Sequence, residues 1–365
     1  MTLTTRAAVV ESGGAPFTLR DVQLDEPGPY EALVRMVATG LCHTDLAAAS
    51  GGLPFPLPGV LGHEGAGVVE AVGSAVTGVA PGDHVVLSFT SFGTCRGGHP
   101  AYCTTWLPLN LIGGRCADGT ATVSRDGEPL GGHFFGQSSF AERALVDERS
   151  LVEIDPDVPL ETVAPLGCGV QTGAGAVWNV LRPVPGSTVA VLGAGAVGLS
   201  AVMAAALTPA TTIVAVDRVP ERLEPAREVG ATHTVDATRE DVPAALRRIS
   251  DGAGADGIVE TTGNVGVLRQ GADALAARGT LVVVGAPPFG TEVPLDVNGL
   301  LSGKRIVGLA LGDSETQAFI PALVRLVREG RLPLHRLIST YPFADIDRAV
   351  RDMSTGKAVK PVLTF

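Results

Sequence analysis

The sequence predicts an α/β protein of two domains, one rich in β-structure and one built on a doubly wound parallel sheet. The chain has 365 residues, which is too long for one ordinary hydrophobic core. Up to about residue 165, short valine-containing runs are separated by glycine, proline and aspartate, as is typical of strands joined by turns. From residue 187 onward, strands and helices alternate, which indicates a parallel sheet with helices on both faces.

The individual elements follow from where apolar residues cluster between turn residues. In the first part, strands are expected in EALVRMVA (31–38), GAGVVEAVG (65–73) and DHVVLS (83–88). In the second part, the order is strand STVAVLG, helix AVGLSAVMAAAL, strand TTIVAVD, helix PERLEPAREVG, strand GIVETTG, helix VLRQGADALAARG and strand TLVVVGA. Pro225 falls inside the second of these helices, where it removes one backbone hydrogen-bond donor.

After residue 312 the pattern becomes that of an amphipathic helix followed by a last strand. In ETQAFIPALVRLVREG, apolar residues recur at helical spacing, and Gly330 ends the run. The predicted apolar face carries Phe319, Leu323, Leu326 and Val327. The closing VKPVLTF is predicted to be a strand.

Composition and charge argue against several classes of protein. The net charge is −11, from 38 acidic and 27 basic residues without a basic run, so a nucleic-acid partner is not expected. The uncharged segment 183–216 is long enough to cross a membrane, but prolines and glycines interrupt it, and we expect a strand, a tight turn and a helix there. The amino terminus lacks an apolar core of signal-peptide length, so we expect a cytoplasmic protein. Its five cysteines are therefore expected to be thiols or metal ligands.

A glycine-rich loop in VAVLGAGAVGLSAV indicates dinucleotide binding. Gly193, Gly195 and Gly198 have the G-x-G-x-x-G spacing between a predicted strand and a predicted helix. The first glycine permits the turn, the second lets the backbone approach a pyrophosphate, and the third lets helix and strand pack closely. The amino terminus of the helix then faces the phosphates.

The residue that ends the next strand bears on the choice of cofactor. Asp217 stands where a carboxylate accepts hydrogen bonds from the adenosine ribose. Such a carboxylate repels a 2′-phosphate and favours NAD over NADP. Arg218 is the opposing feature, because a neighbouring arginine can receive that phosphate.

Three further motifs carry side chains that bind metals. ATGLCHTDL (38–46) and LGHEGAGVVEAVG (61–73) contain cysteine, histidine and acidic residues, and PLGCGVQTGAGAV (165–177) contains another cysteine. Each residue alone is most simply an ordinary buried thiol or a hydrogen-bonded histidine. Together with the glycine loop that follows them, the motifs form one pattern.

On these motifs, the chain resembles the zinc-dependent alcohol dehydrogenases of the medium-chain dehydrogenase/reductase family. The resemblance runs from ATGLCHTDL to the closing STGKAVKPVLTF, and the segment from residue 99 to 146 is most similar to the aryl-alcohol branch. It implies a GroES-like catalytic domain in residues 1–169 and 313–365 and a Rossmann NAD-binding domain in residues 170–312.

The resemblance also implies the metal site. Cys42, His63 and Cys168 match the ligands of a catalytic zinc ion, and a tetrahedral site then keeps a fourth position for water or substrate. Glu64 matches an acidic residue that can approach the metal. Asp45 matches the carboxylate that orients the ligand histidine.

Other positions match residues that act on the substrate proton or on the cofactor. Thr44 matches the catalytic hydroxyl that passes the alcohol proton into a relay, and Ala47 stands where well-studied relatives end that relay with a histidine. Either water or His43 is then expected to take the proton. The matched cofactor contacts are His43 and Lys360 on the pyrophosphate, Val197 behind the nicotinamide and Arg222 near the adenosine ribose. Since the family often has arginine at the two pyrophosphate positions, we expect weaker cofactor binding and faster release.

A second zinc ion, which the family usually binds through four cysteines in FTSFGTCRGGHPAYCTTW (89–106), is not expected. Phe92 replaces the first cysteine, Cys95 and Cys103 fit the second and fourth, and the third is missing. The alternative is a site formed by Cys95, His99 and Cys103 and completed by Cys116. Without metal, the loop is expected to be held by packing of Phe92, Tyr102 and Trp106.

The resemblance favours a primary aromatic, allylic or medium-chain alcohol as the substrate. The candidate pocket residues are Phe55, Leu57, Phe89, Trp106 and Leu111. A thiol-adduct formaldehyde dehydrogenase and a zinc-free quinone or enone reductase of the same fold are the alternatives, as is a non-catalytic protein that kept the fold. The family also implies a homodimer or homotetramer, for which SGKRIVGLAL (302–311) is a plausible edge strand.

Overall fold

The computed structural model describes residues 2–92 and 99–365, which divide into two compact units. The first unit comprises Met1–Cys168, Glu315–Glu329 and Leu337–Phe365, and the second comprises Gly169–Ser314 and Gly330–Arg336. The short segment Gly330–Arg336 thus belongs to the second unit, although the sequence analysis kept residues 313–365 together in the first.

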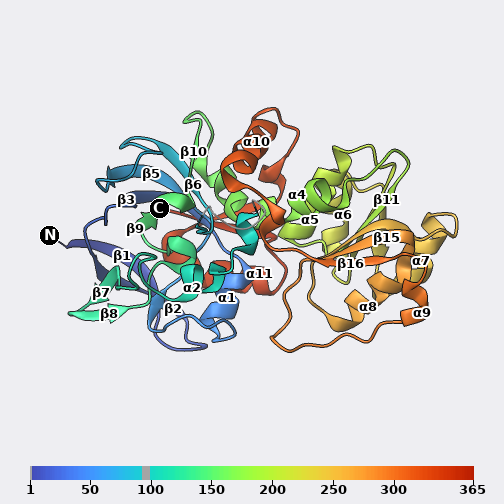
Figure 1. Ribbon diagram of the computed structural model, residues 1–365, viewed down its shortest axis with the longest axis horizontal. Coiled ribbons are helices and arrows are strands. Elements are labelled where there is room, and N and C mark those ends of the chain that lie inside the picture. Colours follow the sequence, from blue (N-terminus) through green and yellow to red (C-terminus); the bar gives the residue numbers. More distant parts are fainter. Residues whose placement is uncertain (1, 93–98) are drawn as a thin grey trace. The chain divides into compact units, whose positions relative to one another are not determined.

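Two sheets form the framework of the first unit (Figure 1). One has the strand order β4-β1-β2-β7-β8, and the other has the order β10-β6-β5-β3-β18-β17 with β9 also paired to β3. Of the strand pairs described in this unit, β17 and β18 are parallel and the other pairs are antiparallel. The strand bounds are β1 Leu3–Val10, β2 Phe17–Leu24, β3 Glu31–Gly40, β4 Gly59–Val60, β5 Gly65–Val72, β6 His84–Leu87, β7 Val123–Arg125, β8 Glu128–Leu130, β9 Arg143–Asp147, β10 Leu151–Ile154, β17 Ile338–Pro342 and β18 Lys360–Thr364.

The three valine-rich runs of the first part are strands β3, β5 and β6, as predicted. Their inward-facing side chains form a core with β9 and β10 that includes Val34, Met36, Val85 and Leu87. The helices of this unit are α1 His43–Ala49, α2 Trp106–Leu111, α3 Leu160–Val163, α10 Thr316–Arg328 and α11 Ile346–Ser354.

Helix α10 buries only part of the predicted face, with Leu323 as the predicted residue that is fully buried. Ile320, Leu323 and Val324 are buried, whereas Phe319 is only half-buried. Leu326 and Val327 are half-buried too, so the sequence identified the helix but only part of its buried face.

A buried ion cluster anchors the segment that follows β8. Glu31 Oε2 accepts hydrogen bonds from Gly28 N at 2.8 Å and from Arg115 Nε at 3.0 Å. His133 Nε2 lies 3.2 Å from Glu31 Oε1. Burial acts to raise the pKa of Glu31, but His133, the Gly28 amide and Arg115 outweigh it and lower the pKa to about 2. The cluster therefore holds His133 against the start of β3.

The second unit is a six-stranded parallel sheet in the order β13-β12-β11-β14-β15-β16. Numbered from the first strand of the unit, this is the order 3-2-1-4-5-6 of a doubly wound dinucleotide-binding fold. Helices α5 and α6 lie on one side of the sheet and α7 and α8 on the other (Figure 1). The bounds are β11 Thr188–Leu192, β12 Thr212–Asp217, β13 His233–Asp236, β14 Ala255–Glu260, β15 Leu275–Val283, β16 Arg305–Gly308, α4 Gly169–Gly175, α5 Ala196–Ala206, α6 Leu223–Glu228, α7 Val242–Ile249, α8 Val265–Ala274 and α9 Val297–Leu300. The fold class predicted from the sequence is confirmed.

The structure accounts for Pro225 and for the uncharged segment 183–216 in the second unit. Pro225 is the third residue of α6, where backbone N–H groups have no partner inside the helix, so its missing donor costs nothing there. The uncharged segment 183–216 contains β11, the glycine loop, α5 and most of β12. Among the described residues, none of the helices has the length and apolarity that a membrane span requires.

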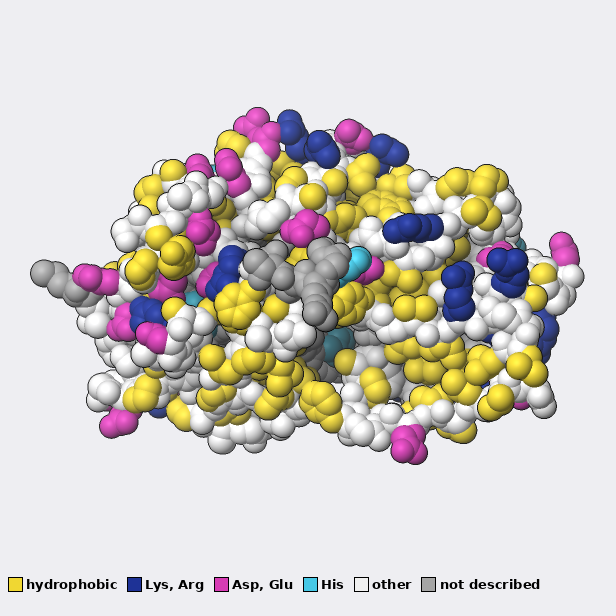
Figure 2. Space-filling model, in the orientation of Figure 1, with side chains coloured by type: hydrophobic (Ala, Val, Ile, Leu, Met, Phe, Trp, Pro, Cys, Tyr) yellow, Lys and Arg dark blue, Asp and Glu magenta, His cyan; other side chains and the backbone are white. Residues whose placement is uncertain are grey.

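The surface carries both signs of charge. On the face drawn in Figure 2, acidic and basic side chains are interspersed with apolar and uncharged ones across the coloured part of the molecule. This distribution agrees with the acidic net charge and offers no broad basic surface on that face for a polyanion.

Candidate metal centre and cofactor loop

Four side chains that can bind a metal converge in the first unit. One ligand atom from each of Cys42, His63, Glu64 and Cys168 lies within 4.8 Å of all the others. His63 and Glu64 are buried, and the two cysteines are partly buried. These are the four residues that the resemblance singled out as metal ligands or as a residue near the metal.

Strand pairing brings the loops of this cluster together. Cys42 follows β3 and His63 precedes β5, and these two strands pair with Thr39 opposite Gly65. A further backbone hydrogen bond connects the two segments at the end of β3, where Gly40 N donates to Glu64 O at 2.9 Å. A Cβ at Gly40 would lie 2.0 Å from Glu64 Oε2, so a larger residue there would displace the Glu64 carboxylate.

Asp45 orients the histidine, as the sequence analysis proposed. Its Oδ1 lies 2.7 Å from His63 Nδ1, and its carboxylate also accepts from Cys42 N at 2.9 Å and Gly62 N at 3.2 Å. With Nδ1 bonded to Asp45, His63 Nε2 is the nitrogen left to bind a metal. It is buried and has no hydrogen-bond partner among the described residues. Two thiols, an imidazole nitrogen and a nearby carboxylate are a donor set that suits zinc.

The electrostatics of the cluster favour a bound cation. Burial acts to lower the pKa of His63, but the Asp45 carboxylate outweighs burial and raises it to about 10. A hydrogen bond from Cys168 lowers the pKa of Cys42, and the same bond raises the pKa of Cys168. Cys42 is therefore favoured as a thiolate, which is the form that binds metals.

Lys360 enters the cluster from the last strand. Leu41 N donates to Pro361 O at 3.0 Å, which places the neighbouring Lys360 beside the loop of Cys42. Its Nζ lies 2.6 Å from Glu64 Oε2 and donates to Leu41 O at 3.1 Å. Burial raises the pKa of Glu64 to about 7, and although burial also acts to lower the pKa of Lys360, the carboxylate raises it above its usual value. The resemblance assigned the Lys360 ammonium to the cofactor pyrophosphate. In the structure, this ammonium is paired with the Glu64 carboxylate of the metal cluster.

The glycine loop in the second unit has the geometry of a phosphate-binding turn. Gly193 has φ +98°, in the left-handed region. A Cβ at Gly198 would lie 1.8 Å from Gly193 O, whereas a Cβ at Gly195 would meet nothing within 4 Å. The third glycine thus serves close packing, and the second leaves open space where a ligand can approach the backbone. Val197 is partly buried in the first turn of α5.

Asp217 ends β12 next to this loop. Its Oδ2 accepts from Ala194 N at 2.7 Å, and its Oδ1 accepts from Val219 N at 2.8 Å. Arg222 Nη1 lies 3.8 Å from Asp217 Oδ2, and the buried Arg222 Nε has no hydrogen-bond partner among the described residues. Arg218 is exposed. Asp217 and Arg222 are therefore close neighbours, as their proposed places around one ribose require.

The remaining predicted residues lie on α1. His43 is exposed, and Thr44 and Ala47 are half-buried. Cys42 Sγ is 3.7 Å from Thr44 Oγ1, so the proposed catalytic hydroxyl adjoins the metal cluster.

The sequence analysis named Phe55 and Trp106 as pocket candidates but missed Phe134 and Phe135, the two aromatic residues that lie beside His63. The Phe135 ring lies 4.7 Å from the His63 ring, and the Phe134 ring lies 5.7 Å from it. Phe55 contacts Phe134 at 4.9 Å, and Trp106 contacts Phe135 at 5.4 Å, both edge to face. Two adjacent aromatic residues within GGHFFG were the available signal, but their direction depends on a left-handed backbone at Phe135, φ +53°.

The loop expected to have lost its zinc is described only in part, and Cys95 lies outside the described residues. Phe92 and Tyr102 are each 47% exposed, so the expectation that they pack the loop together is wrong. Phe92 instead lies 5.0 Å from the Arg149 guanidinium. Cys103 Sγ contacts Thr105 Oγ1 at 3.1 Å. Cys116 Sγ donates to Leu109 O at 3.7 Å, and His99 is exposed.

Comparisons with known proteins agree with this geometry. Residues 28–156 match the alcohol dehydrogenase GroES-like domain, and residues 196–328 match the zinc-binding dehydrogenase domain. The chain is 40% identical to geraniol dehydrogenase of Castellaniella defragrans, over 100% of this chain and 98% of that protein. It superposes on an alcohol dehydrogenase zinc-binding domain protein of Burkholderia ambifaria with a TM-score of 0.97 and 51% identity, over 100% of both chains. For benzyl alcohol dehydrogenase of Acinetobacter calcoaceticus, the TM-score is 0.96 and the identity 43%, over 100% of this chain and 99% of that chain. The chain therefore belongs to the zinc-dependent alcohol dehydrogenases of the medium-chain dehydrogenase/reductase family.

Proposed function

We propose that this protein interconverts a primary aromatic, allylic or medium-chain alcohol and its aldehyde, with NAD as the hydride carrier. The observation that carries the substrate class is the aromatic group around His63, formed by Phe55, Trp106, Phe134 and Phe135. Flat apolar side chains beside the metal cluster suit the ring of an aromatic alcohol or the double bond of an allylic one. Two relatives, a geraniol dehydrogenase and a benzyl alcohol dehydrogenase, are named for an allylic and an aromatic alcohol.

Cys42, His63 and Cys168 would hold one zinc ion, with Glu64 close enough to approach it. Bound zinc supplies Lewis acidity, which lowers the pKa of an alcohol hydroxyl. Asp45 keeps the Nδ1 proton of His63 on the far side of the ring, so that Nε2 faces the other ligands. Thr44 would accept the alcohol proton while its own hydroxyl proton passes on into the relay, since its hydroxyl adjoins Cys42.

Asp217 supports the choice of NAD. Its carboxylate stands at the end of β12 and is already held by two backbone N–H groups, so it is fixed where a 2′-phosphate would have to lie. Arg222, 3.8 Å away, offsets only part of that charge. We expect a higher kcat/KM with NAD than with NADP.

A homodimer or homotetramer is proposed from the edge of the second sheet. Among the strands that the structure describes, β16 has a neighbour on one side only, and Val307 on it is 37% exposed. Phe289, Val297 and Leu301, from the same unit, are exposed by 79%, 71% and 80%. Pairing of two β16 strands across a twofold axis would cover unpaired backbone groups. Sedimentation equilibrium tests this, and a monomer at micromolar concentration would contradict it.

The activity is tested with the purified protein and a substrate panel. Benzyl alcohol and geraniol with NAD should give the aldehydes, detected as NADH absorbance and by product analysis. The same sample is offered a hydroxymethyl thiol adduct, and a quinone together with NADH or NADPH. Turnover of the adduct in preference to the alcohols would favour the formaldehyde dehydrogenase alternative, and quinone reduction without alcohol oxidation would favour the zinc-free reductase.

A further inference from the structure

The segment Phe134–Phe140, here called the brace, connects the loops that carry the candidate metal ligands. It follows β8 and includes a 3₁₀ turn at Phe134–Gly136. Its sequence, FFGQSSF, has no helical or strand periodicity, yet each of its residues is buried. The burial of three adjacent polar residues, Gln137, Ser138 and Ser139, calls for a physical reason, because buried polar groups cost free energy unless they are hydrogen-bonded.

Gln137 is the centre of the brace. Its Oε1 accepts from Gly65 N at 3.0 Å, and its Nε2 donates to His63 O at 3.0 Å and to Ser88 O at 3.2 Å. Both amide hydrogens are thus used, and one side chain ties the backbone on either side of Glu64 to the end of β6. The side chain is 1% exposed, so water does not compete for these bonds.

Ser88 and Ser139 extend the connection to the other two ligand loops. Ser88 Oγ donates to Gly167 O at 2.7 Å, and Gly167 immediately precedes Cys168. Ser139 Oγ and Thr39 Oγ1 share a hydrogen bond of 2.9 Å near the end of β3, which leads to Cys42. The brace therefore contacts the segments of His63 and Cys42 directly by side-chain hydrogen bonds, and it reaches the segment of Cys168 through Ser88.

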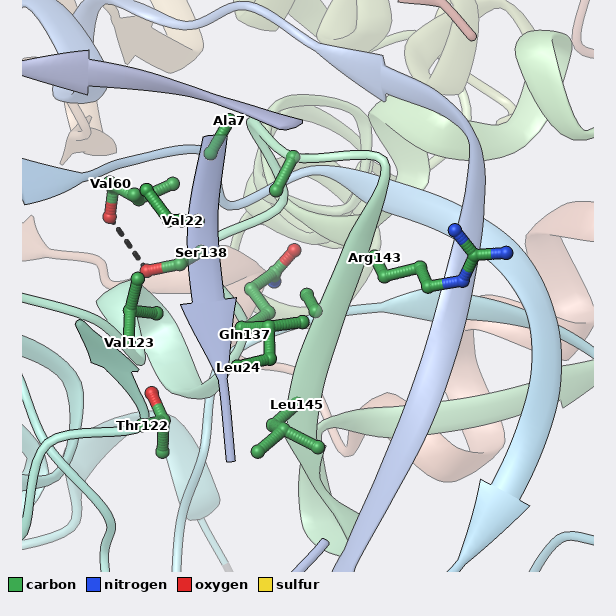
Figure 3. Close-up of a pocket in the computed structure, with 12 residues that line it drawn as sticks. Ala7, Val22, Leu24, Val60, Thr122, Val123, Gln137, Ser138, Arg143 and Leu145 are labelled. Carbon is green, nitrogen blue, oxygen red and sulfur yellow. Dashed lines mark hydrogen bonds between the residues drawn. The ribbon is translucent and has the colours of Figure 1, made fainter. Parts of the chain in front are cut away.

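The brace is itself fixed from both ends. Ser138 Oγ donates to Val60 O at 2.7 Å and accepts from Phe134 N at 2.9 Å, and the first of these bonds is drawn in Figure 3. Gly136 has φ +72°, and a Cβ there would lie 2.0 Å from Thr90 Oγ1, so the turn fits tightly. The cavity in Figure 3, which Gln137 and Ser138 help to line, measures only about 10 Å³ and can hold no more than a water molecule. Gln137 has little room to move away from its partners.

We propose that Gln137 is a positioning residue of the metal centre, which holds the His63 and Cys168 loops in register through the backbone at His63, Gly65 and Ser88. The inference rests on the proposed function, because it requires that the cluster binds zinc. Loss of the Gln137 amide removes this connection between the two loops and should speed metal release, whereas the aromatic group and the cofactor loop keep their own contacts.

The test measures zinc release into a chromophoric chelator from the zinc-loaded full-length protein. Gln137→Met keeps the size of the side chain and removes the hydrogen bonds. Asn110→Leu is the matched control, because Asn110 is equally buried and also makes three hydrogen bonds to the main chain, with Thr90 N, Thr90 O and Trp106 O. Both substitutions cost stability, but only Gln137→Met should release zinc about 10-fold faster or more. The visible spectrum of the cobalt-substituted protein should shift in Gln137→Met and not in the control.

Ser88→Ala is a second variant for the case that Gln137→Met does not fold. It removes the bond to Gly167 O and should release zinc faster than the wild type by a smaller factor. Unchanged release in the variants that fold, or equal acceleration in Gln137→Met and Asn110→Leu, would overturn the proposal. A wild-type protein that binds no zinc would refute the proposed function itself, and this is seen before any variant is compared.

Discussion

Replacement of Asp45 by asparagine keeps the size of the side chain and removes the carboxylate that orients His63. Asp45 is fully buried and accepts from three N–H groups, those of Cys42, Gly62 and His63. Asparagine has one acceptor oxygen and one NH₂ group, so its NH₂ group must face either Cys42 N or both Gly62 N and His63 Nδ1, and at least one contact with a backbone N–H becomes donor against donor. If the NH₂ group faces His63, the proton moves to Nε2 and this nitrogen can no longer bind a metal.

The magnitude follows from the lost contact. A hydrogen bond to a charged group contributes about 1.5–3 kcal/mol, and loss of a partner of a ligand histidine lowers metal affinity about 10- to 100-fold. We therefore expect Asp45→Asn to bind zinc about 10- to 100-fold more weakly, with a matching loss of alcohol oxidation at limiting zinc. Competition with a chelator of known affinity measures the binding.

The control for this substitution is Asp147→Asn in the same unit. Asp147 is 4% exposed and paired with Arg149 at 2.7 Å, so the variant makes the same chemical change away from the metal cluster. It should lose stability and keep its zinc affinity. Unaltered zinc affinity in a folded Asp45→Asn protein would refute the argument that Asp45 sets the tautomer of His63.

Four further changes test other parts of the molecule. Phe135→Ala should raise KM for benzyl alcohol about 10-fold, since one wall of the proposed pocket is lost, with little effect on a short aliphatic alcohol in the same steady-state assay. Gly198→Ala places a Cβ 1.8 Å from Gly193 O and should lower both the melting temperature and the affinity for NADH, measured by nucleotide fluorescence; an unchanged affinity would contradict the role of close packing there. Asp217→Asn removes the charge that repels a 2′-phosphate and should raise the ratio of kcat/KM for NADP to that for NAD by about 10-fold; a constant ratio would show that Asp217 does not select the cofactor. Glu31→Gln should lower the free energy of unfolding at pH 7 by up to about 3 kcal/mol. Because the folded pKa of Glu31 is lowered from 4.5 to about 2, this stabilisation is present above pH 4.5 and is lost as the pH falls toward 2, so urea unfolding should show the two proteins converging there.

The sequence was most informative where a pattern repeats or where spacing carries chemistry. The alternation of strands and helices from residue 187 predicted the parallel sheet, because buried parallel strands are continuous apolar runs. The family resemblance carried by the cysteine and histidine motifs predicted a metal cluster, and the structure brings one ligand atom from each of its four residues within 4.8 Å of the others. Their spacing within the chain could not show this, since Cys42 follows β3 whereas Cys168 lies between the 3₁₀ turn Ala164–Gly167 and α4, far away in the sequence.

The remaining features depend on tertiary contacts that no local pattern records. The buried face of α10 is set by what the helix packs against, as the bond from Gln317 Nε2 to Leu151 O at 2.8 Å shows. Lys360 lies beside Glu64 because β18 pairs with β3, a partner more than three hundred residues earlier in the chain. Gln137 resembles an ordinary loop residue in sequence, and only its three buried partners reveal its place in the structure.

The central claim is a single catalytic zinc ion bound by the cluster of Cys42, His63 and Cys168. The most direct test is the zinc content per chain of protein purified without added metal, with NAD-dependent oxidation of benzyl alcohol assayed on the same sample. We expect one zinc ion per chain, for the one ligand cluster found among the described residues, and activity that a chelator abolishes. Two zinc ions per chain would contradict the loss of the structural site. Full activity in zinc-free protein would contradict the catalytic metal centre itself.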